Sequence, residues 1–257
     1  MAAGGGATTR SEKTFLWRFL AAIVIPFLHV VGRYRIQNIE RIPTSGPFVF
    51  AANHYSNFDP LITAYAVWRA GRVPRFLAKA SIFKVPVLGA ILRATGQIPV
   101  QRAGAPTTAA SPTSATSLAA VQRLTDEGLA VIVYPEGTLT REPDLWPMRG
   151  KTGAVRIALD QNVPLIPAAS WGVQQIMPRY GRLSLFPRKN VTVLVGEPVD
   201  LSAWRGKPLT PALLEEATEA VMTAITTLVA QLRNETPPAG RWNPSEHGQT
   251  EVGRLDS

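Results

Sequence analysis

The sequence alternates short apolar runs with longer segments of helical periodicity, and this alternation constrains the fold more than any other feature. Residues 129–134 (LAVIVY) form the clearest apolar run, which lies between Gly128 and Pro135. A continuous run of this length is typical of a strand buried on both faces. The other predicted strands occupy residues 48–52, 76–79, 97–100, 165–169 and 191–195. The predicted helices occupy residues 60–70, 85–94, 117–127, 150–161 and 211–233.

The alternation predicts an α/β fold: a single domain with a mixed, mostly parallel sheet flanked by helices. The chain of 257 residues is long enough for one such domain with a large buried core. We expect this domain to span residues 33–233, beginning with a connecting strand at residues 33–42. Residues 103–116 are rich in Ala, Thr, Ser and Pro and are expected to form a loop. Composition predicts disorder for residues 1–13 and a flexible tail for residues 234–257.

Residues 14–32 contain an apolar segment, Phe15–Val31, for which contact with a membrane has to be considered. The segment has the minimum length for a membrane span, and Arg18, Pro26 and His29 interrupt it. It is not followed by the small residues of a signal-peptide cleavage site. We therefore expect a helix that lies in the membrane interface with Arg18 near the headgroups. A helix packed on the core of a soluble protein is the alternative.

Composition narrows the possible chemistry. The chain has no cysteine, which excludes disulfides, cysteine-based zinc sites and thiol catalysis. It has only three histidines, so few side chains can act as a general base near neutral pH. The formal net charge of +9 favours anionic partners such as acidic lipid headgroups or phosphorylated substrates. Zinc-finger spacing and dense basic runs are absent from the sequence, so nucleic acid is not expected as a partner.

The first candidate for catalysis is the segment of residues 53–59 (NHYSNFD). It lies where a predicted strand ends and a predicted helix begins, which is where α/β sheets present ligands. At this position His54 can take a proton from a substrate, while Asp59 can fold back and orient the imidazole. In a structural interpretation His54 packs at the strand end and Asp59 caps the helix.

The segment of residues 134–138 (YPEGT) follows the clearest strand. Gly137 and Thr138 can bring backbone N–H groups close to an oxyanion or a phosphate. Glu136 can hydrogen-bond an acceptor hydroxyl or orient nearby basic groups. Taken alone, the segment is an ordinary turn.

Two further motifs are weak on their own. The segment of residues 96–102 (GQIPVQR) ends in Arg102, a residue type suited to bidentate phosphate binding, although a solvated arginine is commoner. The apolar segment of residues 163–169 (VPLIPAA) contains Pro164 and Pro167. It either lines an acyl-chain groove or belongs to the core.

Together, the four motifs resemble those of the glycerolipid acyltransferases that acylate 1-acylglycerol 3-phosphate, the PlsC-type family. In that family an Asn-His-x4-Asp motif, a Gly-x-Ile-x-x-x-Arg motif, a Glu-Gly-Thr motif and an apolar Pro-x-x-Pro strand occur in this order. All four are present here within residues 53–169. The matching positions include Asn53, Gly96, Ile98, Glu136 and Pro164.

The resemblance implies a direct acyl transfer. His54 would deprotonate the acceptor hydroxyl, which attacks the acyl thioester without an acyl-enzyme, and Asp59 would hold His54. The donor would be acyl-CoA or acyl-carrier protein, and the reaction would need no metal or cofactor. The acceptor site would consist of Arg102, Glu136, Gly137 and Thr138.

One position departs from the family pattern. Many relatives follow Glu-Gly-Thr with Arg, whereas Leu139 stands here. Either Arg141 or Arg149 would supply the phosphate contact, or the acceptor is not a simple lysophosphatidate. The next segment, residues 150–153 (GKTG), lacks the earlier glycine that a P-loop requires, so a nucleotide site is not expected. The helix that starts there either helps to bind a phosphate or presents a solvated basic face.

The expected function is therefore the acylation of 1-acylglycerol 3-phosphate to phosphatidic acid in phospholipid biosynthesis. The alternatives are the same chemistry on another lysolipid or a glycolipid, a thioesterase or other hydrolase, and a non-catalytic membrane-binding protein. Because the donors are cytosolic, the resemblance also implies peripheral or monotopic attachment to the cell membrane, with the active site on the cytoplasmic side.

Overall fold

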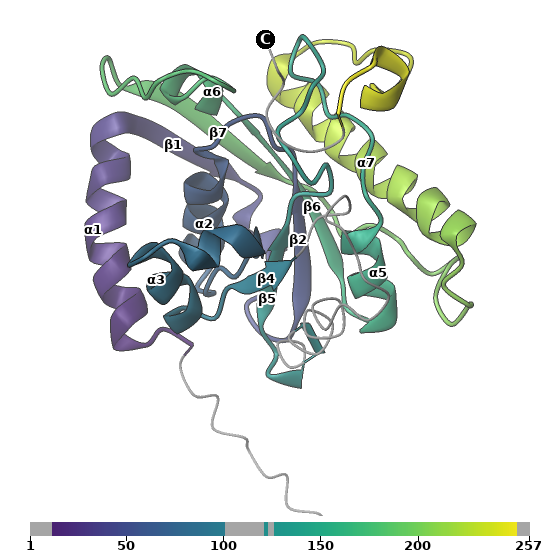
Figure 1. The fold of residues 1–257 in the computed structure, drawn as a ribbon, viewed down its shortest axis with the longest axis horizontal. Helices are drawn as coiled ribbons and strands as arrows, with labels where there is room; N and C mark the ends of the chain where they lie inside the picture. The colour runs from purple at the N-terminus through teal and green to yellow at the C-terminus, as the bar shows by residue number, and fades with distance from the viewer. Residues whose placement is uncertain (1–11, 101–120, 123–125, 251–257) are drawn as a thin grey trace, which may run out of the picture.

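A five-stranded mixed sheet forms the centre of the fold in the computed structural model, which describes residues 12–100, 121–122 and 126–250 (Figure 1). Strands β6 and β7 pair antiparallel, and the other three neighbouring pairs are parallel. This arrangement confirms the predicted mixed, mostly parallel sheet. In spatial order the strands are β1 (Gly32–Gln37), β7 (Lys189–Val195), β6 (Leu165–Trp171), β2 (Phe48–Ala52) and β5 (Ala130–Val133).

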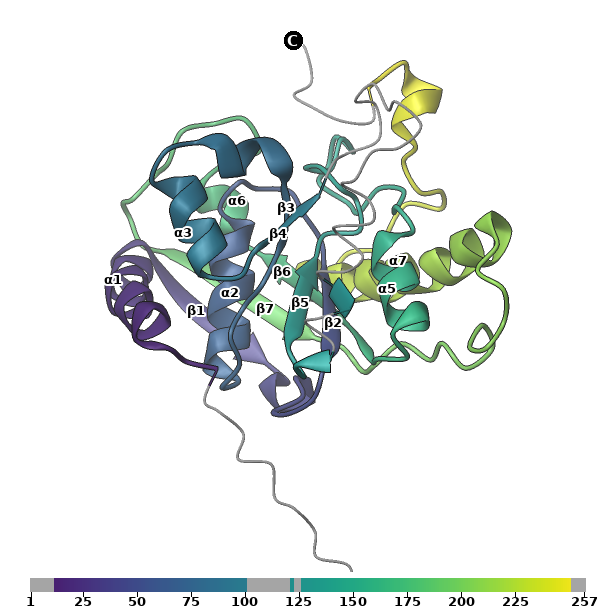
Figure 2. The ribbon, with the colours of Figure 1, turned by 60° about the horizontal axis from the view of Figure 1, so that its bottom comes forward.

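Helices cover both faces of this sheet (Figure 1, Figure 2). Strand β2 is buried at every residue because its two faces both meet apolar side chains. Its Val49 and Ala51 belong to the same apolar cluster as α5 and α7, whereas Phe48 and Phe50 belong to a cluster with Val67 of α2. The helices on one side are α1 (Phe15–Val31), α2 (Asp59–Arg69) and α3 (Leu88–Ala94); those on the other are α5 (Gly153–Asp160) and α7 (Pro211–Arg233).

The remaining elements are short. Strands β3 (Leu77–Lys79) and β4 (Ile98–Val100) form a separate parallel pair, which a bridge between Phe76 and Ile132 connects to β5. Helix α6 (Val173–Ile176) follows β6. Three 3-10 helices, η1 (Ile39–Arg41), η2 (Ala80–Lys84) and η3 (Pro244–His247), complete the described part.

Several predicted elements differ from those observed. The strand expected at residues 33–42 ends at Gln37, and the chain then enters η1. The helix expected from residue 85 begins only at Leu88, because Pro86 and the positive φ of Val87 (61°) interrupt the helical backbone. The loop expected at residues 103–116 lies outside the described residues, as does most of the helix expected at residues 117–127.

Helix α1 has the bounds predicted for the apolar segment and leads directly into β1. Leu28 packs into a core cluster with α2, while Phe15, Phe19, Ile23 and Phe27 are exposed at four-residue intervals. Four-residue spacing places these side chains on one face of the helix. No helix within the described ranges combines the length and apolar character that crossing a membrane requires.

Ion pairs fix the segment that precedes α1. The Glu12 carboxylate accepts hydrogen bonds from Arg72 Nε at 2.8 Å and from Arg75 Nη1 at 3.0 Å. Both arginines are buried, with 2% and 8% of their surface exposed. Disorder was expected through residue 13, but these buried guanidinium groups hold Glu12 in place.

Residues 234–250, for which a flexible tail is predicted, lie along α7 and make hydrogen bonds with it. Arg241 Nε donates to Glu219 Oε1 of that helix at 2.8 Å, and the carbonyl of Trp242 accepts from the Arg149 N–H at 2.9 Å. This segment is held mainly by hydrogen bonds and not by apolar burial. Its polar composition therefore gives no sign that it packs on α7.

Candidate active site

The site is built at the carboxyl ends of two neighbouring parallel strands, β2 and β5. Ala51 of β2 pairs with Val133 of β5, so the segments that leave these strands emerge side by side. One is the His54 segment and the other is the turn at residues 134–138. The fold therefore brings together two motifs that are 82 residues apart in the sequence.

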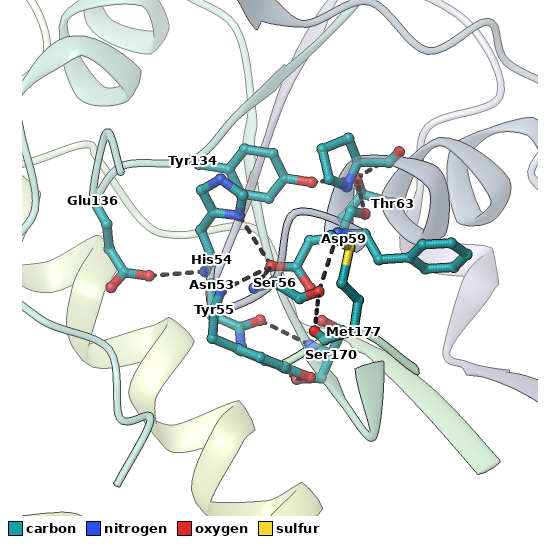
Figure 3. A network of polar contacts seen from close by, with 12 residues as sticks. Asn53, His54, Tyr55, Ser56, Asp59, Thr63, Tyr134, Glu136, Ser170 and Met177 are labelled. Atoms are coloured by element: carbon teal, nitrogen blue, oxygen red, sulfur yellow. Dashed lines mark hydrogen bonds and ion pairs between the residues drawn. The ribbon is translucent and has the colours of Figure 1, made fainter. Parts of the chain in front are cut away.

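Asp59 holds the imidazole of His54. The His54 Nδ1 atom lies 2.9 Å from Asp59 Oδ2, and the same oxygen accepts the backbone N–H groups of Tyr55 and Ser56 at 2.8 Å each (Figure 3). Because Asp59 is fully buried and its Oδ2 acts as an acceptor, Nδ1 carries the ring proton. The lone pair is then on Nε2, and the His54 side chain remains 13% exposed on a cavity wall. This geometry is suited to general-base catalysis.

Tyr134 fixes the plane of the His54 ring. The two rings stack with centroids 4.1 Å apart and an interplanar angle of 17°. The Tyr134 hydroxyl lies 2.7 Å from Thr63 Oγ1, which donates in turn to the carbonyl of Asp59. Burial, followed by the negative charge of Asp59, raises the pKa of Tyr134, so its hydroxyl stays protonated and can donate to Thr63. The sequence alone does not indicate a role for Tyr134, because only the pairing of β2 with β5 brings its ring onto His54.

Glu136 holds the backbone of His54 instead of facing the cavity. Its Oε1 accepts the His54 N–H at 2.9 Å (Figure 3), and its Oε2 accepts the Met148 N–H at 3.1 Å. The Thr140 N–H donates to the His54 carbonyl at 2.7 Å, so the segment after β5 binds His54 from both sides. Glu136 is 1% exposed, and burial raises its pKa to about 8. The Glu136 carboxyl group is therefore directed into the loop, and its expected contact with the acceptor stays a prediction.

Several other motif residues have structural positions. Asn53 Oδ1 accepts the Ser170 N–H at 2.8 Å and so ties the end of β2 to β6. Pro167 is buried within β6, and the Pro164 carbonyl accepts the Val49 N–H at 2.9 Å. The segment around these prolines therefore has a structural position in the sheet, and the acyl-groove interpretation of it stays a prediction. Gly96 has a φ of 70° after α3, and Ile98 is buried in β4.

The basic residues that were expected to bind phosphate differ in whether they line the cavity beside His54. Arg141 is 1% exposed, and the exposed Arg149 lies with its Nη2 3.6 Å from Glu215 of α7; neither lines the cavity beside His54. Lys151 does line it, as does Gly137, whereas Thr138 is buried. Arg102 lies outside the described residues.

Two neighbouring cavities lie near His54, which lines the first of them. The first, of about 560 Å³, is bounded by the turn after β5, the start of α5 and the β3–β4 pair. The second, of about 370 Å³, has almost entirely apolar walls formed by α1, α2 and α3. The residues that line both are Pro60, Phe76, Leu92 and Gln97. The arrangement places a candidate general base on the wall of one cavity and an apolar cavity next to it, which suits a reaction on a lipid.

Comparison with known proteins identifies relatives of this arrangement. The family model described as Acyltransferase matches residues 33–171. The chloroplast 1-acyl-sn-glycerol-3-phosphate acyltransferase of Brassica napus is 31% identical over 166 residues, which cover 64% of this chain and 44% of that protein. The chain thus spans less than half of that relative, and the match to the Arabidopsis thaliana chloroplast enzyme covers 49% of its length.

Two bacterial proteins match over most of their length. The 1-acyl-sn-glycerol-3-phosphate acyltransferase of Bacillus subtilis is 27% identical over 86% of this chain and 98% of its own length. The crystal structure of the 1-acyl-sn-glycerophosphate acyltransferase PlsC from Thermotoga maritima superposes with a TM-score of 0.60 at 24% identity, covering 88% of this chain and 85% of that one. At that identity the structural likeness shows a shared fold.

Proposed function

The chain belongs to the Acyltransferase family, and on that premise we propose that it transfers a fatty acyl group from an acyl thioester to the free hydroxyl of 1-acylglycerol 3-phosphate. The observation that carries the proposal is the His54–Asp59 pair on the wall of a cavity that neighbours an apolar one. The names of the curated relatives favour this acceptor.

The proposed reaction is a single displacement at the thioester carbonyl. His54 Nε2 takes the proton of the acceptor hydroxyl while the hydroxyl oxygen forms a bond to the carbonyl carbon. The carbon–sulfur bond then breaks, and the proton passes from His54 to the leaving thiolate. The products are a new ester and the free thiol of coenzyme A or acyl-carrier protein. Asp59 stabilises the positive charge that His54 carries between these two proton transfers.

The apolar cavity among α1, α2 and α3 supports a substrate with a hydrocarbon chain. Its walls include Trp17, Leu61 and Ile91, and it shares Pro60, Phe76, Leu92 and Gln97 with the His54 cavity. Burying an acyl chain there would remove apolar surface from water at about 25 cal/mol per Å².

We also propose peripheral attachment to a membrane through the exposed face of α1, with the active site on the cytoplasmic side, where acyl thioesters are available. The exposed aromatic and aliphatic side chains of α1 support this attachment. The test is co-sedimentation with phospholipid vesicles: Phe19→Ser with Ile23→Ser should reduce binding, and unchanged binding would contradict the attachment.

Leu139 favours a second class of acceptor, lysolipids other than 1-acylglycerol 3-phosphate. Leu139 occupies the place at which many relatives have an arginine, and its side chain is only 7% exposed. A weaker phosphate contact would permit the same chemistry on another lysolipid.

The decisive experiment is acyl transfer from long-chain acyl-CoA, and separately from acyl-carrier protein, to a panel of lysolipids. We expect the highest activity with 1-acylglycerol 3-phosphate and its loss in His54→Ala. Activity confined to a different lysolipid would change the identity of the acceptor but leave the proposed mechanism in place. Release of free fatty acid without transfer would instead identify a thioesterase, and equal activity in His54→Ala would refute the catalytic role.

A further inference from the structure

The large apolar side chains that are exposed to solvent lie in three segments of the chain. Within the described ranges, they all belong to residues 15–30, 82–88 or 180–186. The first segment is α1, the second runs from η2 to the start of α3, and the third lies between α6 and β7. We refer to the three together as the apolar surface. An exposed apolar patch made of several segments is typical of an interaction site.

The three segments are neighbours in the fold. Helices α1 and α3 line the same apolar cavity. Ile176 of α6 belongs to the same core cluster as Leu28 of α1, and Arg188 Nη2 donates to the carbonyl of Gly32 at the end of α1 at 3.1 Å. Both views show α1, α3 and α6 on one side of the molecule, away from α5 and α7 (Figure 1, Figure 2). The apolar surface is therefore a single face of the protein.

Val87 is held in a strained conformation on this face. It has a φ of 61° and a ψ of −60°, and the Leu88 N–H donates across it to the Pro86 carbonyl at 2.6 Å. This is a γ-turn of the rare, strained type. A β-branched residue is disfavoured at positive φ, where glycine would relieve the strain, and the Val87 side chain is 74% exposed. The valine thus costs stability without being buried in the fold, which indicates a role in contact with another molecule.

The charged residues of the same part of the chain are all basic. Residues 15–37, 77–100 and 173–195 contain no Asp or Glu, although the chain has 18 of them. Arg18, Lys84 and Arg182 are exposed in or beside the three segments. An anionic bilayer offers negative headgroups above an apolar layer, and so matches exposed apolar side chains with cations beside them. A second copy of this chain would instead bring two positive faces together.

We propose that the apolar surface docks on an anionic lipid bilayer at three places, with the Val87 turn and the segment of residues 180–186 inserting beside α1. This inference rests on the proposed attachment through α1, to which it adds two insertion points that are distant in the sequence. Because all three belong to one fold, their contributions to binding combine.

The absence of cysteine from the chain permits a direct test by site-specific labelling. Val87→Cys and Leu183→Cys are each labelled with a fluorophore that shifts to the blue in an apolar environment, and Ile23→Cys on α1 is the reference. Lys207→Cys is the control, because Lys207 is exposed in the loop before α7. Each labelled full chain is titrated with vesicles of phosphatidylcholine and phosphatidylglycerol, and with vesicles of phosphatidylcholine alone.

We expect a blue shift at residues 23, 87 and 183 with the anionic vesicles, and none at residue 207. Reaching the same shift with the neutral vesicles should take about tenfold to a hundredfold more lipid, since several cations lose their attraction to the headgroups. A shift at residue 23 alone would overturn the inference and leave attachment through α1. No shift at any position would refute both. Neither result depends on acyl transfer, which is measured separately.

Val87→Gly separates membrane binding from stability. It relieves the positive φ, so urea unfolding should show equal or greater stability. Its affinity for the anionic vesicles in co-sedimentation should nevertheless fall by about threefold to tenfold, as should that of Leu183→Ser. Lys84→Gln should lower affinity by about fivefold with anionic vesicles only, whereas Lys207→Gln should bind like the wild type. Acyl transfer to a detergent-dispersed acceptor should be unchanged in all four variants.

Three results of the second experiment would overturn the inference. Unchanged vesicle affinity in both Val87→Gly and Leu183→Ser would show that the two segments do not insert. A marked loss of stability in Val87→Gly would show that the side chain supports the fold. A dimer of the wild type in the absence of lipid, abolished by the same substitutions, would assign the apolar surface to a second copy of the chain.

Discussion

The raised pKa of the buried Glu136 predicts how the free energy of unfolding depends on pH. Burial raises its pKa from 4.5 to about 8, against the opposing effect of its hydrogen bonds from the Met148 and His54 N–H groups. Between these pH values the folded chain retains a proton that the unfolded chain has lost. The free energy of unfolding therefore falls as the pH rises through this window.

The size of the effect follows from the shift. Each pKa unit corresponds to about 1.4 kcal/mol, so a shift of about 3.5 units corresponds to about 5 kcal/mol. The contribution of Glu136 is fully present below pH 4.5 and is lost as the pH passes about 8. Such a loss is a large part of the stability of an ordinary domain, at about 5 to 15 kcal/mol.

Glu136→Gln isolates this contribution because glutamine has nearly the same shape and does not titrate. We expect the free energy of unfolding of the wild type, minus that of the variant, to fall by about 5 kcal/mol between pH 4.5 and about pH 8. Groups that titrate elsewhere are the same in both proteins, so their contributions cancel in this difference. The assay is urea unfolding followed by tryptophan fluorescence at a series of pH values, with linear extrapolation to zero urea. A difference that is independent of pH, or that moves in favour of the wild type as the pH rises, would refute the reasoning.

Substitutions at three other positions test the geometry around His54. Asp59→Asn removes the charge that stabilises the imidazolium, and kcat for acyl transfer should fall by about a hundredfold or more; near-normal turnover would contradict the role of the pair. Tyr134→Leu removes the ring stack and should lower kcat by about tenfold, whereas Tyr134→Phe keeps the stack; equal losses in both would count against stacking. Gly137→Ala strains the φ of 71° at this position and places a Cβ 3.1 Å from Lys151 Cδ, so urea unfolding should show a loss of about 1 to 2 kcal/mol; unchanged stability would argue against the close approach.

The sequence predicts those parts of the site that are local. His54 and Asp59 are five residues apart across one turn, so their contact follows from the strand-to-helix transition alone. Strand β5 is equally local, since a run of apolar residues between two turn signals indicates a buried strand. The bounds of α7 follow from its apolar spacing, from Pro211 at its first turn and from Asn234 in the left-handed conformation after its end.

The features that the sequence misses all depend on which strands are neighbours. Glu136 has the residue type of an acceptor ligand, and its inward direction is fixed only when β5 lies beside β2 and presents its turn to the His54 backbone. The apolar pattern of β7 does not indicate that this strand pairs antiparallel with β6. Lys151 stands out among the basic residues after the motif only because α5 begins beside the same turn.

Glu12 has a mechanical consequence for the whole molecule. It lies just before α1 and is held by two buried arginines, while the other end of α1 continues into the edge strand β1. A helix that is fixed at both ends keeps one position relative to the rest of the fold. Its exposed apolar face therefore keeps one orientation relative to His54. If this face binds a lipid surface as we propose, the tilt of the protein and the depth of His54 are set by the fold itself.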